Sequence, residues 1–217
     1  EKPDLFVLSG DLCYRDPSRA TYAWIKKIMA NTGIPWQVTP GNHDDTDLLA
    51  EVFELSGEVR NHCLDRRMER GEWVILFVDS GKGHVSELQL LWLQRQLAEA
   101  GDLIAVFIHH PVLEADVPFM DINYPLQNKA EVEQVLCNSG KQVVVFSGHY
   151  HVEKTIIRGR ISQFITPSTF LQINPVSENF EVDHYRPAFR EIVLSGEGTL
   201  NTRLVYDHSD RAIAVSR

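Results

Sequence analysis

Hydrophobic residues in this chain gather in short continuous runs, and polar residues follow each run directly. The clearest runs span residues 4–9, 34–38, 103–108 and 143–146. Unbroken apolar runs of this length are typical of strands that are buried on both faces of a sheet. We therefore predict four buried strands. The polar residues just past their ends are candidates for a functional site, because α/β sheets usually place their sites there.

Helical periodicity fills the segments between these runs. Apolar side chains at helical spacing predict helices over residues 17–31, 47–57, 86–100 and 128–139. Asp16 is the expected N-cap of the first helix, with Pro17 in its first turn, and Gly33 is expected to close it. Ser86 and Gln89 have the spacing of a capping box at the start of the third helix.

The pattern changes in the last third of the chain. Residues 72–78 read as a further strand and residues 111–127 as a loop with several prolines, but from Thr155 onward only short strands and turn signals appear. Strand-helix alternation that gives way to hairpins predicts two sheets packed face to face with helices outside. We therefore expect an α/β (α+β) fold, a four-layer α-β-β-α sandwich of two mixed sheets, in a single domain over residues 1–217.

Composition is that of an ordinary globular protein, with 43% hydrophobic and 24% charged residues among 217. The net charge of −9 argues against a nucleic-acid duplex or a membrane surface as partner, because proteins that bind these usually carry a basic face. An acidic protein that handles phosphate needs another source of positive charge, such as a metal ion. The three cysteines are widely spaced and suggest no disulfide framework, which fits a reducing cytoplasm. No apolar run approaches the roughly 18 residues that span a bilayer, and the first residues do not resemble a signal peptide.

Carboxylate, amide and imidazole side chains follow the four predicted strands. Gly10-Asp11 ends the first strand, Asn42-His43 the second, His109 the third, and His149 with His151 the fourth. This convergence indicates a metal site. On an extended chain, His149 and His151 face the same way about 6.5–7 Å apart, so each can serve one of two ions separated by about 3.5–4 Å.

The types of these side chains indicate which ions they suit. Asp11 has two oxygens and a full negative charge, which suits a position between two cations, whereas Asn42 offers a neutral carbonyl oxygen. Nitrogen and oxygen ligands without a thiolate favour two divalent ions, Mn²⁺, Fe or Zn²⁺, over Cu(I) or an iron–sulfur cluster.

These motifs, in this order, resemble those of the calcineurin-like metallophosphoesterase superfamily. The resemblance covers essentially the whole chain from Asp4 to Tyr206 and is closest to the bacterial class III cyclic-nucleotide phosphodiesterases. Further matching stretches are His109-His110-Pro111, Met120-Asp121, Leu126-Gln127-Asn128, Thr166-Pro167-Ser168-Thr169 and the ending from Arg190 to Arg203. The resemblance implies the metallophosphoesterase type of sandwich. It also implies a small-molecule substrate, with hydrolysis of the 3′-phosphoester bond of 3′,5′-cyclic nucleotides, cyclic AMP to 5′-AMP.

The resemblance also implies roles for individual residues. It assigns Asp11 as the bridging ligand, with Asn42, His109 and His149 completing the second metal and His151 binding the first. Asn42 and His43 would contact the substrate phosphate. A hydroxide held between the metals would attack phosphorus in line with the departing 3′-oxygen, and His43 would support or protonate that oxygen.

One part of the family pattern has no counterpart here. Members begin with a strand that ends in Asp-x-His, and no such motif precedes Asp11; Asp207-His208-Ser209-Asp210 has the residue types but the wrong spacing, and is interpreted as a solvated tail. We therefore expect a domain whose first strand is missing, with weak occupancy of the first metal, which keeps only Asp11 and His151, and impaired turnover. A missing strand also leaves unpaired sheet edges, which favours a homodimer or strand exchange.

Less specific interpretations stand beside these. His110 is expected to hold the ligands in place, Asp44 to do the same or to cap a helix, and Cys13 to be a small buried hydrophobe. At the level of function, the alternatives are a broader small-molecule phosphodiesterase or phosphomonoesterase, and a catalytically impaired nucleotide-binding module.

Overall fold

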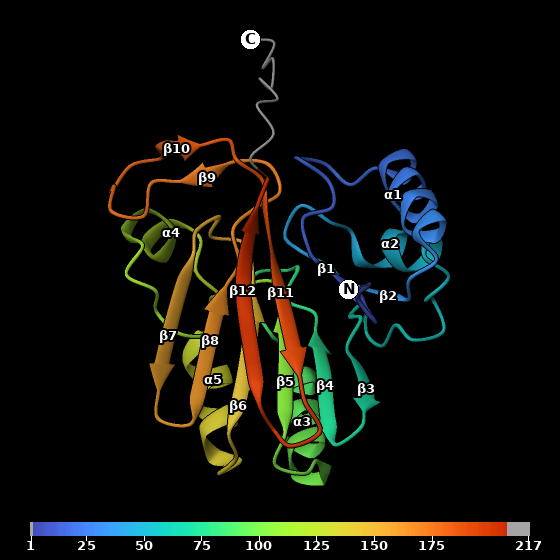
Figure 1. Ribbon diagram of the computed structural model, residues 1–217, viewed down its shortest axis with the longest axis vertical. Coiled ribbons are helices and arrows are strands. Elements are labelled where there is room, and N and C mark those ends of the chain that lie inside the picture. Colours follow the sequence, from blue (N-terminus) through green and yellow to red (C-terminus); the bar gives the residue numbers. More distant parts are fainter. Residues whose placement is uncertain (1, 208–217) are drawn as a thin grey trace.

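The structure is a computed structural model that describes residues 2–207. Its elements are, in chain order, β1 (Phe6–Ser9), α1 (Arg19–Thr32), β2 (Trp36–Thr39), α2 (Thr46–Val52), β3 (Arg66–Arg70), β4 (Trp73–Val78), α3 (Glu87–Glu99), β5 (Ile104–Ile108), α4 (Pro118–Asn123), α5 (Lys129–Asn138), β6 (Val143–Ser147), β7 (Lys154–Arg158), β8 (Ile161–Ile165), β9 (Gln172–Ile173), β10 (Val182–His184), β11 (Ala188–Leu194) and β12 (Leu200–Tyr206). Figure 1 shows their arrangement.

A six-stranded mixed sheet forms the centre of the molecule, in the order β3-β4-β5-β6-β8-β7. Strands β4, β5, β6 and β8 are parallel, and β3 and β7 pair antiparallel at the two edges. All residues of β4 and β5 are buried, as expected for unbroken apolar runs between two layers. The predicted strands over 72–78, 103–108 and 143–146 are therefore confirmed.

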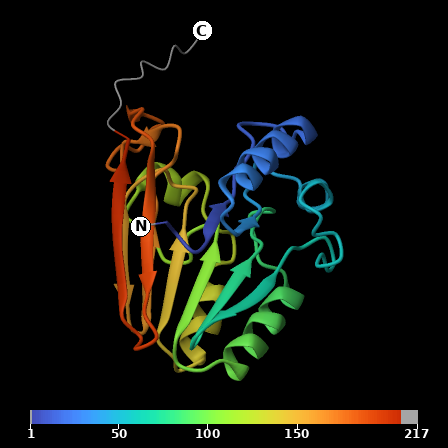
Figure 2. The same ribbon diagram turned by 45° about the vertical axis from the view of Figure 1, so that its right-hand side comes forward.

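Helices α3 and α5 cover one face of this sheet. Leu93 and Leu97 of α3 and Val132 and Leu136 of α5 are buried in one cluster with side chains of the parallel strands. The predicted capping box starts α3, since Ser86 accepts a hydrogen bond from the backbone N–H of Gln89 and the Gln89 side chain accepts one from the Ser86 N–H. These two helices lie on the far side of the sheet from the antiparallel hairpin β11–β12 (Figure 2).

The other face of the sheet is covered by strands. Val7 of β1 and Ile192 and Leu200 of the hairpin β11–β12 pack against a second cluster that contains Phe107 and Phe146. Because successive side chains of a strand point to opposite faces, Leu8 points away from this layer and contacts a third cluster, together with α1 and α2. Helices α1 and α2 thus cover β1 and β2 from outside.

The second strand layer differs from the single mixed sheet that we expected. Strands β1 and β2 form a parallel pair, and β11 and β12 form an antiparallel hairpin, but no ladder joins the two pairs. Within residues 2–207, no strand hydrogen-bonds to both β1 and the hairpin, so the second layer consists of separate ladders. The α/β fold with mixed sheets is confirmed, while the second sheet is split into two ladders.

Several element boundaries differ from the sequence prediction. The N-cap of α1 is Ser18, not Asp16, because the Ser18 hydroxyl accepts a hydrogen bond from the backbone of Thr21. Gly33 closes α1 in the left-handed conformation as predicted. Helix α2 ends at Val52, well before residue 57, because Glu54 adopts a left-handed φ of 62°.

Two elements were missed, and parts of the prediction lie outside the described residues. Strand β3 is the edge of the sheet, where alternation is weak, and α4 is a six-residue helix inside the segment expected to be a loop. Of the predicted tail, Asp207 is described and exposed, whereas residues 208–210 lie outside the described residues. Within residues 2–207, no helix has the length and apolar character needed to cross a membrane.

Candidate metal centre

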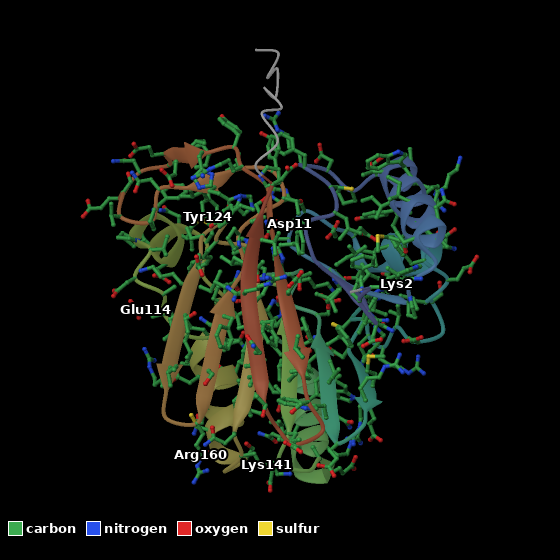
Figure 3. All side chains as sticks on the ribbon, viewed as in Figure 1. Lys2, Asp11, Glu114, Tyr124, Lys141 and Arg160 are labelled. Atoms are coloured by element: carbon green, nitrogen blue, oxygen red, sulfur yellow. The ribbon has the colours of Figure 1, made fainter. Side chains whose placement is uncertain are left out.

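Asp11 lies just past the carboxyl end of β1, on a backbone that few residues adopt. Gly10 has φ of 91° and Asp11 has φ of 54°, both in the left-handed region. A Cβ on Gly10 would collide with the ring of His109. The Gly10-Asp11 pair therefore brings the Asp11 carboxylate close to the end of β5, at the end of the molecule where the parallel strands finish (Figure 3).

His109 follows β5 and is fully enclosed. Its Nδ1 lies 2.7 Å from the carbonyl oxygen of Ser9, and its Nε2 lies 3.2 Å from Oδ2 of Asp11. A carbonyl partner on one ring nitrogen places the proton there and leaves the other nitrogen as a metal ligand. His109 is held in this way by the last residue of β1.

His149 follows β6, and the structure holds it in the same manner. Its Nε2 lies 3.0 Å from the carbonyl oxygen of Tyr124, and its ring centroid is 5.0 Å from that of His109. Tyr124 comes from the loop after α4, the segment that Figure 3 labels beside Asp11. Nδ1 of His149 is left for a ligand.

Asp11, His109 and His149 form a group in which one ligand atom of each lies within 4.8 Å of the others. Two nitrogens and a carboxylate oxygen are donors that suit Mn²⁺, Fe or Zn²⁺. The buried Nε2 of His109 has no hydrogen-bond partner of acceptable geometry within residues 2–207, although Asp11 is close. Buried polar atoms normally have a partner, so an atom without one, facing a carboxylate and a second imidazole, fits a metal ligand.

The electrostatics of the group follow from burial and from the charges within it. Burial opposes ionisation of Asp11, but the charge of His109 and a backbone N–H from His43 hold the pKa of Asp11 well below its usual range. Burial opposes protonation of His109, but the Asp11 carboxylate outweighs it and raises the pKa of His109. For His149, burial and the neighbouring His109 lower the pKa to about 3. His149 is thus neutral, as a metal ligand must be.

Asn42 and His43 lie in the turn after β2, against Asp11. The His43 backbone N–H donates to Oδ1 of Asp11 at 3.0 Å, and a Cβ on Gly41 would collide with the Asp11 carboxylate and backbone. Nδ1 of His43 lies 3.0 Å from the carbonyl oxygen of Arg15, which leaves Nε2 available to a substrate. Asn42 is exposed and His43 half-buried. The turn therefore contacts the group from the solvent side.

Asp44 fixes this turn from behind. Its carboxylate accepts hydrogen bonds from the backbone N–H groups of Gly41 (2.9 Å) and Leu12 (3.1 Å) and from the hydroxyl of Tyr22 (3.0 Å). The two segments that carry Asp11 and His43 are thereby joined through one side chain. This position agrees with the expected supporting role of Asp44.

His151 lies beside the three-residue group but is not part of it. Its φ is 52°, and its buried Nδ1 has no hydrogen-bond partner within residues 2–207. Burial outweighs the attraction of Asp11 and lowers the pKa of His151 to about 4. A neutral imidazole whose buried Nδ1 lacks a partner within residues 2–207 suits a metal ligand, and the resemblance implies that His151 binds the first metal.

His110 is buried behind the group, where Ser80 holds it. The Ser80 hydroxyl lies 2.9 Å from Nδ1 of His110, and the His110 ring centroid is 4.2 Å from that of His149. The sequence prediction missed Ser80. The signal was present, because Asp79-Ser80-Gly81 directly follows a buried apolar run, as the predicted site motifs do.

Comparison with known proteins agrees with this fold. Residues 1–153 match the calcineurin-like phosphoesterase family, and the chain belongs to this family of metal-dependent hydrolases. It is 34% identical over 206 residues to a probable cyclic nucleotide phosphodiesterase of Fibrobacter succinogenes, covering 95% of this chain and 80% of that protein.

Two further relatives extend the comparison. The chain is 32% identical over 208 residues to the 3′,5′-cyclic adenosine monophosphate phosphodiesterase CpdA of Escherichia coli (strain K12), covering 93% of this chain and 74% of that protein. A dimetal phosphatase from Danio rerio has a similar structure, with a TM-score of 0.60 at 14% identity over 87% of this chain and 79% of that one. This chain is thus a metallophosphoesterase of the cyclic-nucleotide-phosphodiesterase-like kind.

Proposed function

We propose that this enzyme hydrolyses the 3′-phosphoester bond of 3′,5′-cyclic nucleotides, with cyclic AMP giving 5′-AMP. The observation that carries the proposal is the group of Asp11, His109 and His149 with His43 fixed against it. A phosphodiester is an anion and this chain has a net charge of −9, so bound cations are a natural source of positive charge at the site. The names of the two relatives support a cyclic nucleotide as the substrate.

We propose that two divalent ions, Mn²⁺, Fe or Zn²⁺, occupy the centre. Asp11, His109 and His149, with the carbonyl oxygen of Asn42, would hold one ion, and Asp11 with His151 would hold the other. When bound, such ions neutralise phosphate charge and make a water nucleophilic at neutral pH. The site formed by Asp11 and His151 has only these two ligands within residues 2–207, so a higher metal concentration is needed to fill it.

We assign to His43 the role of proton donor to the leaving 3′-oxygen, supported by its hydrogen bonds on both sides of the turn. Its Nδ1 lies 3.0 Å from the Arg15 carbonyl oxygen, so the ring cannot turn freely and Nε2 is the nitrogen left for a substrate. Its backbone N–H holds Asp11 at the same time. Because the Arg15 carbonyl oxygen accepts a hydrogen bond from Nδ1, Nε2 carries a proton only in the imidazolium form, and in that form it would donate it to the departing alkoxide and leave the neutral ring.

Hydrolysis of cyclic AMP with and without added Mn²⁺ tests the proposal. We expect 5′-AMP to form only with metal, at a rate that rises into the millimolar range of Mn²⁺. We expect His43→Gln to lower kcat by about 10²–10³-fold. The matched control is His84→Gln, which alters an exposed histidine in the loop before α3.

The same assay separates the alternatives. Equal rates with cyclic AMP and with other phosphodiesters or monoesters would favour the broader phosphoesterase. Binding of 5′-AMP without hydrolysis of any phosphoester at saturating Mn²⁺ would contradict the proposal and favour a nucleotide-binding module.

A further inference from the structure

Three aromatic side chains form an exposed patch that the metal centre does not explain. The Phe170 ring contacts the rings of Tyr14 and Tyr185 edge to face. The ring centroids lie 5.5 Å apart for Tyr14 and Phe170, and 6.4 Å apart for Phe170 and Tyr185. Their exposed fractions are 66%, 36% and 44%. We call these three residues the aromatic rim. A contiguous apolar patch of this kind usually marks a binding surface.

Tyr14 of the aromatic rim lies near the metal centre. Tyr14 is three residues past Asp11, within about 10 Å along an extended chain, and its neighbour Arg15 contacts His43 through its carbonyl oxygen. Both the loop after β1 and the segment before β9 lie at the upper end of the molecule in Figure 1.

Phe170 of the aromatic rim belongs to a segment that is hydrogen-bonded to the backbone of His151. Phe170 lies three residues before Ile173, whose backbone N–H donates to the His151 carbonyl oxygen at 3.1 Å. The contact between Tyr14 and Phe170 therefore joins the segment that fixes His43 to the segment that fixes His151. A molecule whose phosphate lies between these histidines has the aromatic rim beside it.

A positive charge accompanies the aromatic rim. The Arg15 guanidinium carbon lies 5.3 Å from the centroid of the Tyr14 ring, within the range of a cation–π contact. Arg15 is exposed and lies in a chain of net charge −9. A surface that offers aromatic faces and one guanidinium fits a ligand that carries a flat aromatic ring on an anionic group.

We propose that the aromatic rim stacks on the base of the nucleotide, with the Tyr14 ring as its main platform and Arg15 beside the phosphate. The proposal rests on the proposed function for the identity of the substrate. The rim makes no base-specific hydrogen bond in this arrangement, because stacking depends on the π-face that every base has. It therefore gives affinity for nucleotides over phosphates that lack a base, and little preference among bases.

Binding of product analogues measures this directly. Titration calorimetry on the Mn²⁺-loaded chain compares 5′-AMP with ribose 5-phosphate, which has the same phosphate and sugar but no base. We expect 5′-AMP to bind about tenfold or more tightly, and Tyr14→Ala to remove that preference while leaving the affinity for ribose 5-phosphate within about twofold. Tyr14→Phe keeps the ring and should keep the preference. Trp24→Ala, which removes an exposed ring from α1, is the matched control.

The outcomes are separable from those of the proposed function. Equal affinity for the two compounds in the unaltered chain, or an unchanged preference in Tyr14→Ala, would overturn the base site and leave the aromatic rim as a surface for another macromolecule. A preference for 5′-AMP that Tyr14→Ala removes, in a chain that does not hydrolyse cyclic AMP, would support the base site and contradict the proposed function.

Discussion

At the scale of single residues, the metal centre depends on backbone conformations that side chains rarely adopt. Asp11, His149 and His151 have φ of 54°, 61° and 52°. Left-handed backbone at such residues costs on the order of 1–3 kcal/mol each and is concentrated at functional sites. The sequence predicted which residue types converge at the strand ends, but not these dihedral angles, because they are imposed by tertiary contacts such as that between Ser9 and His109.

Gly41 offers a direct test of this close packing. A Cβ there would collide with the carboxylate and backbone N of Asp11, so we expect Gly41→Ala to lower the affinity for Mn²⁺ by at least tenfold. The measurement is titration of Mn²⁺ into the purified variant. Gly57→Ala is the matched control, since nothing lies within 4 Å of the added Cβ. Equal Mn²⁺ affinity in the two variants would show that Asp11 does not need its present position.

At the scale of elements, polar side chains join β3, β4 and α3 beneath the metal centre. Oδ1 of Asp65 accepts hydrogen bonds from the Asp79 backbone N–H and from Nε2 of Gln89, both at 2.9 Å. Asp79 in turn accepts from Thr46 and Gly81. This junction fixes the loop that contains Ser80, and through it His110.

Burial raises the pKa of Asp65 to about 6 and outweighs the hydrogen bonds from Gln89 and the Asp79 backbone, which lower it, so stability depends on pH. Between about pH 4 and pH 6 the folded state binds more protons than the unfolded state, so the free energy of unfolding falls as pH rises through this window. Asp65→Asn keeps the acceptor oxygen without the charge. We expect its stability advantage over the unaltered chain to grow by about 1–2 kcal/mol from pH 5 to pH 8.

Urea unfolding at the two pH values measures this difference. Asp102→Asn, at an exposed position before β5, is the control and should follow the unaltered chain at both pH values. A constant difference between Asp65→Asn and the unaltered chain would mean that Asp65 keeps an ordinary pKa.

The predictability of the elements also follows from packing. The strands over 103–108 and 143–146 and the helix with a capping box were predicted correctly, since local pattern and tertiary environment agree there. The strand over 4–9 was expected to be buried, but β1 is half-buried at all four of its residues and pairs with β2 alone. Strand β3 and helix α4 were missed. Both depend on contacts with distant segments. Arg66 of β3 donates a hydrogen bond to the Val38 carbonyl oxygen of β2, and Asp121 of α4 accepts one from the Tyr150 hydroxyl at 2.9 Å.

At the scale of the whole molecule, the second strand layer has open edges, because its two ladders are not joined to each other. Within residues 2–207, β1 pairs only with β2, and β11 pairs only with β12. Unpaired edges accept strands from other chains. We therefore expect self-association, and sedimentation velocity should show an average mass that rises with concentration above that of one chain. A single species of one-chain mass at every concentration would contradict this expectation.

The central claim is that side chains far apart in the sequence hold divalent metal ions together. Anomalous diffraction at the manganese edge, from crystals of this chain grown with Mn²⁺, tests it most directly. We predict a strong peak within coordination distance of Asp11, His109 and His149, and a weaker peak beside Asp11 and His151. The absence of a peak beside Asp11, His109 and His149, with these side chains ordered as described, would contradict the account.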